Sequence, residues 1–450
     1  MAIAVSVLCA SGCGVLARKA VTAVTAIKTS QVFVQGRRGP LTSEEQHWAE
    51  YAWHFVGNNY GNATGLVAGS DRGSLATAWD MGDAVAMTLI AHDLQLLDNA
   101  AFDERISTFI AFLNTAELVD GHLPNLYYDV HTGKPMRGES HPGIAGWSVR
   151  DCAHLLLWLY VLRERYAHFR GYINSAVRRW SLCAAVEPDG VLHNAQWLGG
   201  HLTYSRSERI GYEDYDSLGF SLWGLAVSRD SPSSTVRAAS VLIRKDDRDP
   251  RTSTIPDSVL SGPYLLAGIE FGWDLPFARR PFRAKHTDTA MAEQAGNIYQ
   301  AQAERYRQTQ TITARTDHRS AVFPDLIHDS IFASGYSWNT VTTSGQFAPE
   351  TSLVATKAAF GIWALWKTDY SDTVLADVEE LRDPQRGWFE GRMERTGGYD
   401  RTITLATNAM VMEALQYKRV GRLVPELTHD GASAGPGCCG CANPVSADSR

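Results

Sequence analysis

Apolar residues recur at the spacing of amphipathic helices over most of residues 43–425, in blocks that are separated by loops. The first block follows Ser43 and Gln46, whose spacing is that of a capping box at the start of a helix. Residues 322–332 are a candidate for short strands. The pattern predicts further helices over residues 74–97, 102–116, 148–166, from there to about 183, 215–227, 290–308, 352–367, 371–381 and 402–417.

The predicted order is helix–loop–helix throughout, with about ten to twelve helices and no strong run of buried parallel strands. A toroid of paired helices and a looser globule of many helices both fit this order. The toroid is favoured because its long, aromatic and charged loops would gather at one end and line a cleft. We therefore predict one domain, dominated by α-helix, over residues 43–425, with loops 193–214, 330–350 and 384–401 on one face.

The two ends of the chain differ in composition from this domain. Residues 1–19 are mainly apolar or small and are similar to a signal peptide, and residues 10–13 read Ala-Ser-Gly-Cys, like the end of a lipobox. Cys13 would then be lipidated; the alternative is a frayed apolar N-terminus. Residues 20–42 are typical of a linker. Residues 426–450 hold Cys438, Cys439 and Cys441 among Gly, Ala, Pro and Ser, which favours a disordered tail over a metal site.

Composition and charge narrow the class of ligand. Hydrophobic residues make up 44% of the chain, which is enough for a large core, and the net charge is -7. Nucleic-acid binding depends on clustered Lys and Arg, so this charge argues against it and mildly against any polyanionic substrate. The chain also holds 13 Trp and 17 Tyr. Most of them belong in the core, but those in loops would suit stacking on neutral sugar rings.

The motifs of several common enzyme classes are missing from the sequence: there is no GxSxG, P-loop, HExxH or dinucleotide-binding GxGxxG. We therefore expect no cofactor and no metal. Many carboxylates and many aromatic residues remain. Glycoside hydrolysis needs little more, namely one carboxyl to protonate the leaving oxygen and one carboxylate to activate water or attack the sugar.

The loop that ends in SERIGYEDYD offers the candidates for the general acid. Glu208 and Glu213 lie among aromatic residues just ahead of a predicted helix, with Tyr212 beside them. Asp214 and Asp216 follow at positions where the helix dipole favours negative charge. Helix capping is the alternative role for all four carboxylates.

Two helix starts offer candidates for a partner carboxylate. Asp80 and Asp83 lie three residues apart on one predicted face, beside Trp79, where a cleft and a solvated face are equally good explanations. Asp151 follows Trp147 near another helix start and shares a face with His154. Asp151 could instead complement the helix dipole, and a packed structural role is the more common one for such a histidine.

The third group of candidates comes from the loops and the helix near the C-terminus. The stretch GWFEGRMERTGGYD contains Trp388, Glu390 and Arg392, although a solvated hairpin explains its alternation equally well. Asn408 lies inside an apolar helix, where a buried amide needs partners or a cleft. Trp338, in the loop 330–350, is a further candidate for contact with substrate.

Seven stretches occur together in the order of a known family: TAWDMGD, FDERI, GWSVRDC, ERIGYEDYDSLGFSLWG, ATKAAFGIWALW, GWFEGRMERTGGYD and TNAMVMEALQY. Over residues 74–422 the chain thereby resembles the bacterial domain-of-unknown-function 3131 family. The resemblance implies an (α/α)6 toroid related to carbohydrate enzymes such as endo-β-1,2-glucanases. It also implies an exported or envelope-anchored protein, periplasmic or attached to the outer membrane.

The resulting hypothesis is a glycoside hydrolase that acts on a neutral, β-glucan-like glycan. Glu208 or Glu213 would be the acid, and Asp80, Asp83, Asp151 or Glu390 its partner. The substrate contacts would come from Trp79, Asp83, Trp147, Tyr212, Trp338, Trp388, Arg392 and Asn408. The alternatives are a non-catalytic glycan-binding or envelope scaffold lipoprotein and, less favoured by the acidic charge, a polysaccharide lyase. Membrane contact would come only through Cys13.

Overall fold

The fold was analysed in a computed structural model, which describes residues 36–207, 209–225, 227–228, 232–248, 258–273, 289–320 and 326–425. The predicted signal-like segment with Cys13, most of the linker, Glu208 and the tail 426–450 lie outside the described residues. No helix in the described ranges is both long and apolar enough to cross a membrane.

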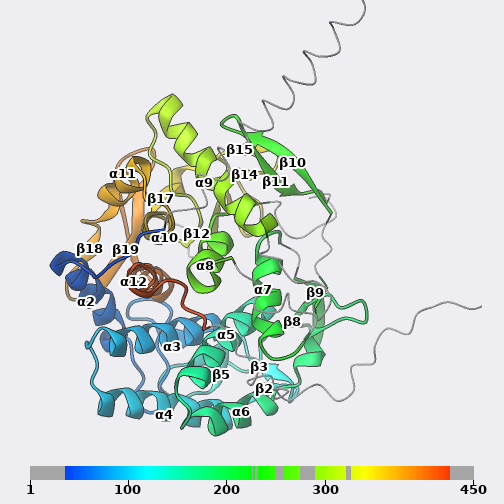
Figure 1. The fold of residues 1–450 in the computed structure, drawn as a ribbon. Coiled ribbons are helices and arrows are strands. Elements are labelled where there is room, and N and C mark those ends of the chain that lie inside the picture. The colour runs from blue at the N-terminus through cyan, green and yellow to red at the C-terminus, as the bar shows by residue number, and fades with distance from the viewer. Residues whose placement is uncertain are drawn as a thin grey trace, which may run out of the picture.

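Six inner helices form a closed ring (Figure 1). Each of them contacts the next along the chain, and the last returns to the first. They are almost entirely buried, and all ten residues of the fourth helix are buried. In ring order they are α3 (Ala78–Asp93), α5 (Val149–Arg165), α7 (Tyr212–Ser221), α8 (Gly262–Phe271), α10 (Thr356–Leu365) and α12 (Leu405–Val420).

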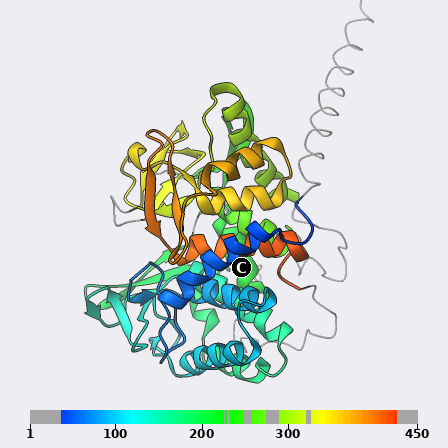
Figure 2. The same cartoon turned by 90° about the vertical axis from the view of Figure 1, so that its left-hand side faces the viewer.

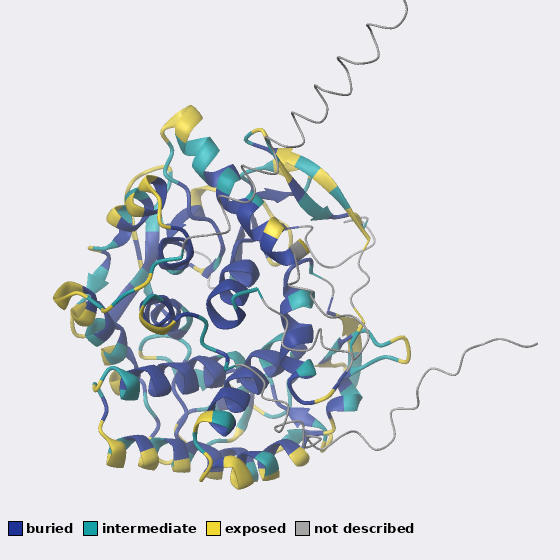
Figure 3. Cartoon of the chain, in the orientation of Figure 1, coloured by how far each residue is buried: buried dark blue, intermediate teal, exposed yellow. Residues whose placement is uncertain are grey.

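The outer helices alternate with the inner ones along the chain and bury only one side, so their outer faces are exposed (Figure 3). They are α2 (Ser43–Asn58), α4 (Asn99–Thr115), α6 (Arg170–Arg178), α9 (Thr289–Thr309) and α11 (Asp369–Val378). Between α7 and α8 the described residues form a hairpin, β10 (Ser233–Ala238) with β11 (Val241–Asp246), which packs on α9. Helix α2 lies against α12 and so brings the two ends of the domain together (Figure 2). The predicted toroid of paired helices is confirmed.

Side-chain caps fix where several of these helices begin. Helix α2 is closed by a capping box of Thr42 and Glu45, one residue earlier than the predicted Ser43 and Gln46. Asp80 has the equivalent position at the start of α3, where Thr77 is the N-cap. The N-cap of α12 is Thr404. Such caps satisfy backbone N–H groups that a helix leaves unpaired at its N-terminus.

Short antiparallel sheets cover the end of the ring from which the inner helices start. One sheet has the order β1 (Leu75–Ala76), β4 (Tyr127–Asp129), β5 (Pro135–Gly138), β6 (His141–Pro142). A second has the order β7 (Gly146–Trp147), β8 (His193–Leu198), β9 (His201–Arg206). A third has the order β12 (Asp317–Arg319), β13 (Leu326–Asp329), β16 (Thr340–Thr342).

The fourth sheet joins β17 (Leu353–Ala355), β19 (Gly387–Met393) and β18 (Arg382–Asp383), and β20 (Tyr399–Ile403) also pairs with β19. Two small pairs remain, β2 (Leu118–Val119) with β3 (Leu123–Pro124) and β14 (Phe332–Ala333) with β15 (Tyr336–Ser337). Each of the three segments predicted as loops therefore contains short strands. Their alternation of apolar and polar residues is the pattern of a half-buried strand.

Candidate active site

A cavity of about 450 Å³ lies where the N-terminal ends of the six inner helices meet. Six Asp and Glu residues line it. Helix N-termini carry partial positive charge and favour acidic side chains nearby, so this end of the ring is suited to hold carboxylates. The first turns of the inner helices contribute Asp80, Asp151, Tyr212, Gly262, Lys357 and Ala406 to the lining.

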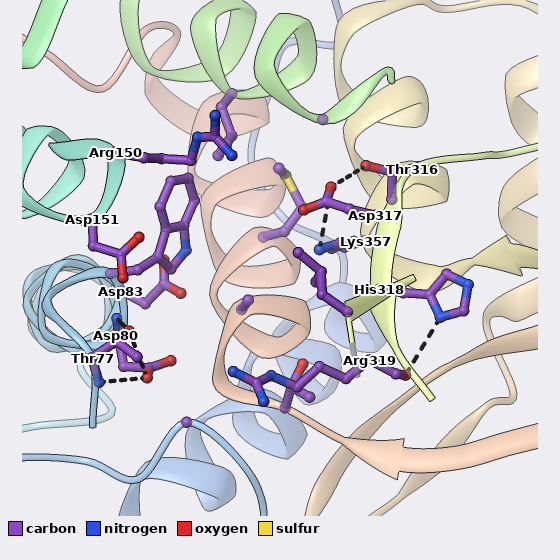
Figure 4. A pocket seen from close by; sticks show the side chains of 18 of the residues that line it. Thr77, Asp80, Asp83, Arg150, Asp151, Thr316, Asp317, His318, Arg319 and Lys357 are labelled. Carbon is purple, nitrogen blue, oxygen red and sulfur yellow. Dashed lines mark hydrogen bonds and ion pairs between the residues drawn. The ribbon is translucent and has the colours of Figure 1, made fainter. Parts of the chain in front are cut away.

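Asp80 lies on the wall of the cavity that α3 forms (Figure 4). Its Oδ2 atom accepts hydrogen bonds from the backbone N–H of Thr77 at 2.8 Å and from the Thr77 hydroxyl at 2.9 Å. Burial raises the pKa of Asp80 to about 6, although Arg319 and the Thr77 donors act in the opposite direction. A carboxyl group in this state can deliver a proton close to neutral pH.

Asp151 lies on the same wall, in the first turn of α5. The Ser148 hydroxyl, at the N-cap, donates to Asp151 Oδ1 at 2.8 Å. Burial raises the pKa of Asp151, against the hydrogen bond from Ser148 and the charge of Arg150. The wall thus carries two carboxyls that hold their protons more strongly than an exposed aspartate.

An aromatic surface on this wall is fixed from behind by His154. The Trp79 ring stacks on the His154 ring with 4.0 Å between centroids and 9° between planes. His154 is fully buried, and its two ring nitrogens lie 2.8 Å from Asp83 Oδ1 and 2.7 Å from the Tyr215 hydroxyl. This histidine is a packed, hydrogen-bonded residue, and it sets the orientation of both Trp79 and Asp83, which line the cavity.

Asp317 faces this wall from strand β12 (Figure 4). The Tyr212 hydroxyl donates to its Oδ2 atom at 3.0 Å, and the Thr316 hydroxyl donates to Oδ1 at 2.9 Å. Lys357 Nζ lies 3.9 Å from Oδ1. Burial alone would raise the pKa of Asp317, but the charges of Lys357 and His328, with the two donors, outweigh burial and hold it well below its ordinary value. At a pH between these two pKa values, Asp317 is therefore ionised while Asp80 is protonated.

Glu390 connects three elements beside the cavity. Its Oε1 atom accepts hydrogen bonds from the Thr404 and Thr407 hydroxyls, each at 2.5 Å, and Oε2 accepts one from the backbone N–H of Arg319 at 3.3 Å. The side chain is only 1% exposed. Glu390 therefore positions β12 and the start of α12 and is a poor candidate for proton transfer to a substrate.

Two further carboxyls are buried among the inner helices. Glu270 of α8 lies with Oε1 3.9 Å from His154 Nδ1, and neither oxygen of Glu413 accepts a hydrogen bond within the described ranges. Burial raises the pKa of Glu270 to about 7. Burial, with the charges of Glu270 and Asp83, raises the pKa of Glu413 well above its ordinary value. Both groups therefore keep their protons in the folded state to a higher pH than in the unfolded chain.

Replacing Glu413 with glutamine is expected to flatten the dependence of stability on pH. Because the pKa of Glu413 is raised in the folded state, its contribution to the free energy of unfolding is fully present in mild acid and is lost as pH rises. One retained proton changes the free energy of unfolding by about 1.4 kcal/mol per pH unit. Calorimetric melting at pH 5 and pH 8 should show similar melting temperatures at pH 5 and a more stable variant at pH 8. The exposed Glu350→Gln change is the matched control, and equal slopes for all three proteins would contradict this account.

Five of the residues predicted to bind substrate are not among the residues that line the cavity. Trp147 and Trp388 are buried, and their indole N–H groups donate to the carbonyls of His193 and Trp48. Asn408 is buried; it accepts a hydrogen bond from the backbone of Trp388 and donates to the Thr404 carbonyl. Trp338 packs under Arg305, and Arg392 donates to the Asp377 carbonyl. These contacts give all five structural roles.

Glu213, one of the two predicted acids, does not line the cavity either. Glu213 belongs to the first turn of α7, the position that the alternative of helix capping assigns to it, and it is not part of the lining. Glu208 lies outside the described residues. The lining does contain Trp79, Asp80, Asp83, Asp151, Tyr212 and Glu390 from the predicted set.

Asp317, Arg319 and Lys357 line the cavity but were not predicted as site residues. Asp317 and Arg319 belong to a three-residue strand that the helical pattern did not reveal. The alternation Asp-His-Arg was the one available signal, because alternate residues of a strand point to the same side. No group of three or more His, Cys, Asp or Glu residues within the described ranges is arranged to hold a metal ion.

The fold is shared with solved glycan-active proteins. An endo-β-1,2-glucanase from Chitinophaga pinensis, in complex with sophorotriose and glucose, has a TM-score of 0.60 at 11% identity and covers 85% of this chain and 94% of its own. A protein from Bacteroides caccae that is provisionally named a glucoamylase has a TM-score of 0.58 at 11% identity and covers 85% of this chain and 94% of its own. An endo-β-1,2-glucanase from Talaromyces funiculosus, in complex with sophorose, has a TM-score of 0.51 at 12% identity and covers 85% of this chain and 84% of its own. These similarities show an (α/α)6 toroid.

No curated protein matches the chain in sequence. A family model does match it: the family described as "Protein of unknown function (DUF3131)" aligns with residues 47–421. That match covers the whole ring of inner helices and the sheets around the cavity. The chain therefore belongs to the DUF3131 family.

Proposed function

We propose that the protein is a glycoside hydrolase in which Asp80 is the general acid and Asp317 is the second catalytic carboxylate. The observation that carries the proposal is that two carboxyls with different protonation states face each other across one cavity. Asp80 has a pKa of about 6, whereas the pKa of Asp317 is held well below its ordinary value. Glycoside hydrolysis needs a protonated carboxyl for the leaving oxygen and an ionised one that activates water or attacks the sugar.

The surrounding residues support these two roles. Thr77 binds only the Oδ2 atom of Asp80, so Oδ1 is left to carry a proton toward the cavity. Tyr212, Thr316 and Lys357 keep Asp317 ionised and fix its orientation. Trp79 offers an aromatic surface next to Asp80, on which a sugar ring can stack.

A neutral glucan is the substrate class that this site supports best. The chain carries a net charge of -7, which disfavours association with a polyanionic glycan. The shared fold includes two endo-β-1,2-glucanases, which makes β-1,2-glucan the first substrate to test. Asp151, which also has a raised pKa, is the competing candidate for the acid.

Incubation of the purified protein with a panel of glycans tests the proposal. The panel contains β-1,2-, β-1,3-, β-1,4- and β-1,6-glucans, starch and one uronic-acid polymer, and release of reducing ends is measured at pH 5–6. We expect cleavage of a neutral glucan, with β-1,2-glucan first, and none of the uronic-acid polymer. Unsaturated products from the uronic-acid polymer would indicate a lyase, and binding without cleavage of any glycan would contradict catalysis.

A further inference from the structure

Arg319 is an exposed cation whose charged group has no partner within the described ranges. Its side chain extends from β12 across the cavity toward Thr77 and Asp80 (Figure 4). Among the described residues the guanidinium makes no hydrogen bond, whereas the backbone N–H donates to Glu390 Oε2. The other cations of the cavity are engaged, since Lys357 lies 3.9 Å from Asp317 and the Arg150 guanidinium lies 3.9 Å from the centre of the Tyr212 ring.

The backbone from which this side chain extends is held on two sides. Arg319 pairs with Leu326 of β13 in the antiparallel register, and Glu390 of β19 accepts its N–H. Asp317 and Arg319 point into the cavity, whereas His318 points away from it, as alternate residues of a strand do (Figure 4). The free guanidinium is therefore presented from the same rigid strand as the ionised carboxylate.

The chemistry of guanidinium suits one kind of partner at this place. Its planar N–H groups form parallel hydrogen bonds to two neighbouring oxygens, which a lysine cannot reproduce. Adjacent hydroxyl groups of a hexose present such a pair of oxygens. We infer that Arg319 is a specificity-determining residue that binds two neighbouring hydroxyls of the sugar unit placed against Asp80; this inference rests on the proposed hydrolase function.

The charge of Arg319 has a second effect, which can be separated from its geometry. Asp80 faces Asp83 of its own helix and Arg319 from β12, while Asp151 of α5 and Glu390 of β19 line the same cavity. Arg319 is the cation among these groups and favours the ionised form of Asp80. Its removal raises the pKa of Asp80, so activity that needs protonated Asp80 persists to higher pH. Lysine keeps this charge but loses the paired donors.

The experiment compares Arg319→Gln, Arg319→Lys and the control Arg307→Gln, an exposed arginine of α9 that pairs with Glu304. Affinity for β-1,2-gluco-oligosaccharides is measured by calorimetry in the Asp317→Asn background, where cleavage is expected to be too slow to consume the ligand during the titration. The pH dependence of kcat is measured with Asp317 intact. Both Arg319 variants should bind roughly 10- to 100-fold more weakly, as expected for lost hydrogen bonds to a charged group. Only Arg319→Gln should move the alkaline limb, upward by about one pH unit.

Each outcome decides the inference. Weaker binding in both Arg319 variants, with the pH shift confined to glutamine and an unchanged Arg307→Gln, supports it. Binding by Arg319→Gln within twofold of the parent overturns it, while cleavage by the parent leaves the hydrolase function standing. Equal pH limbs in both Arg319 variants overturn the electrostatic role. A parent that neither binds nor cleaves any glycan overturns the proposed function and this inference with it.

Discussion

Replacing Asp317 with asparagine is expected to lower kcat on the cleaved glucan by roughly 10³-fold, within the range of a positioned acid or base. Asparagine has nearly the same size and keeps one oxygen, which can accept a hydrogen bond from either Tyr212 or Thr316, but it cannot carry the charge that activates water or attacks the sugar. Asp317 and Lys357 are both mostly buried, so loss of the aspartate charge is expected to lower the melting temperature as well, and rates are compared at a temperature at which both proteins are folded. Initial rates and melting curves are measured on the same preparations.

The matched control is Asp189→Asn. Asp189 also has a lowered pKa, from a backbone N–H and Arg206, but it is exposed and does not line the cavity. We expect this variant to keep the parental kcat. Asp317→Asn with near-parental turnover, or a loss of turnover that follows a loss of folded protein, would remove Asp317 from the catalytic pair.

Much of the fold could be predicted because outer helices alternate apolar and polar residues at helical spacing, whereas the long inner helices are apolar runs. The outer helix α4 buries one side only, and the long inner helices α3 and α5 carry apolar runs that begin at clear caps. Helix α8 was missed because all ten of its residues are buried, so no polar face marks a helical period. Its length is also that of a buried strand, which makes its pattern ambiguous.

The site was predicted where its residues lie near helix starts and missed where they come from strands. Asp80 was a candidate because it shares a helix face with Asp83, and Asp151 because it lies near a helix start; in the structure these helix starts also surround the cavity. Asp317 and Arg319 come from a short strand, and what places them opposite Asp80 is the closure of the ring. Local sequence patterns hold no information on which residues lie opposite each other once the ring has closed.

The aromatic residues show the opposite error. Trp147 and Trp388 were assigned to substrate because they stand next to acidic residues in the sequence, yet both are core residues. A large indole gains most from burial when its N–H finds a backbone acceptor, and both rings find one. Trp79 differs because it stacks on the buried His154 and still lines the cavity. Neighbouring charge alone does not distinguish these cases.

Replacing Asp80 with asparagine is expected to reduce kcat by roughly 10²–10⁴-fold and to remove the alkaline limb of the pH profile. The pKa of Asp80 is about 6, so in the parent the protonated fraction, and with it kcat, falls about tenfold per pH unit above that value. Asparagine cannot deliver a proton at any pH, so the residual rate should not follow that decline. Thr77 remains the N-cap and asparagine keeps one oxygen that can accept from the backbone N–H of Thr77, so α3 should keep its start.

Two further variants separate catalysis from capping and from the competing acid. Asp98→Asn changes the N-cap of α4, which is exposed and lies outside the cavity lining, and it should leave both kcat and the pH profile unchanged. Asp151→Asn removes the other carboxyl of the same wall that has a raised pKa. If Asp151→Asn loses the alkaline limb while Asp80→Asn keeps it, the proton comes from Asp151, and Asp80 is only the cap of α3. If Asp80→Asn alone loses the alkaline limb and remains folded, the Asp80 carboxyl is the acid. A residue that only caps a helix would not make kcat depend on pH in this way.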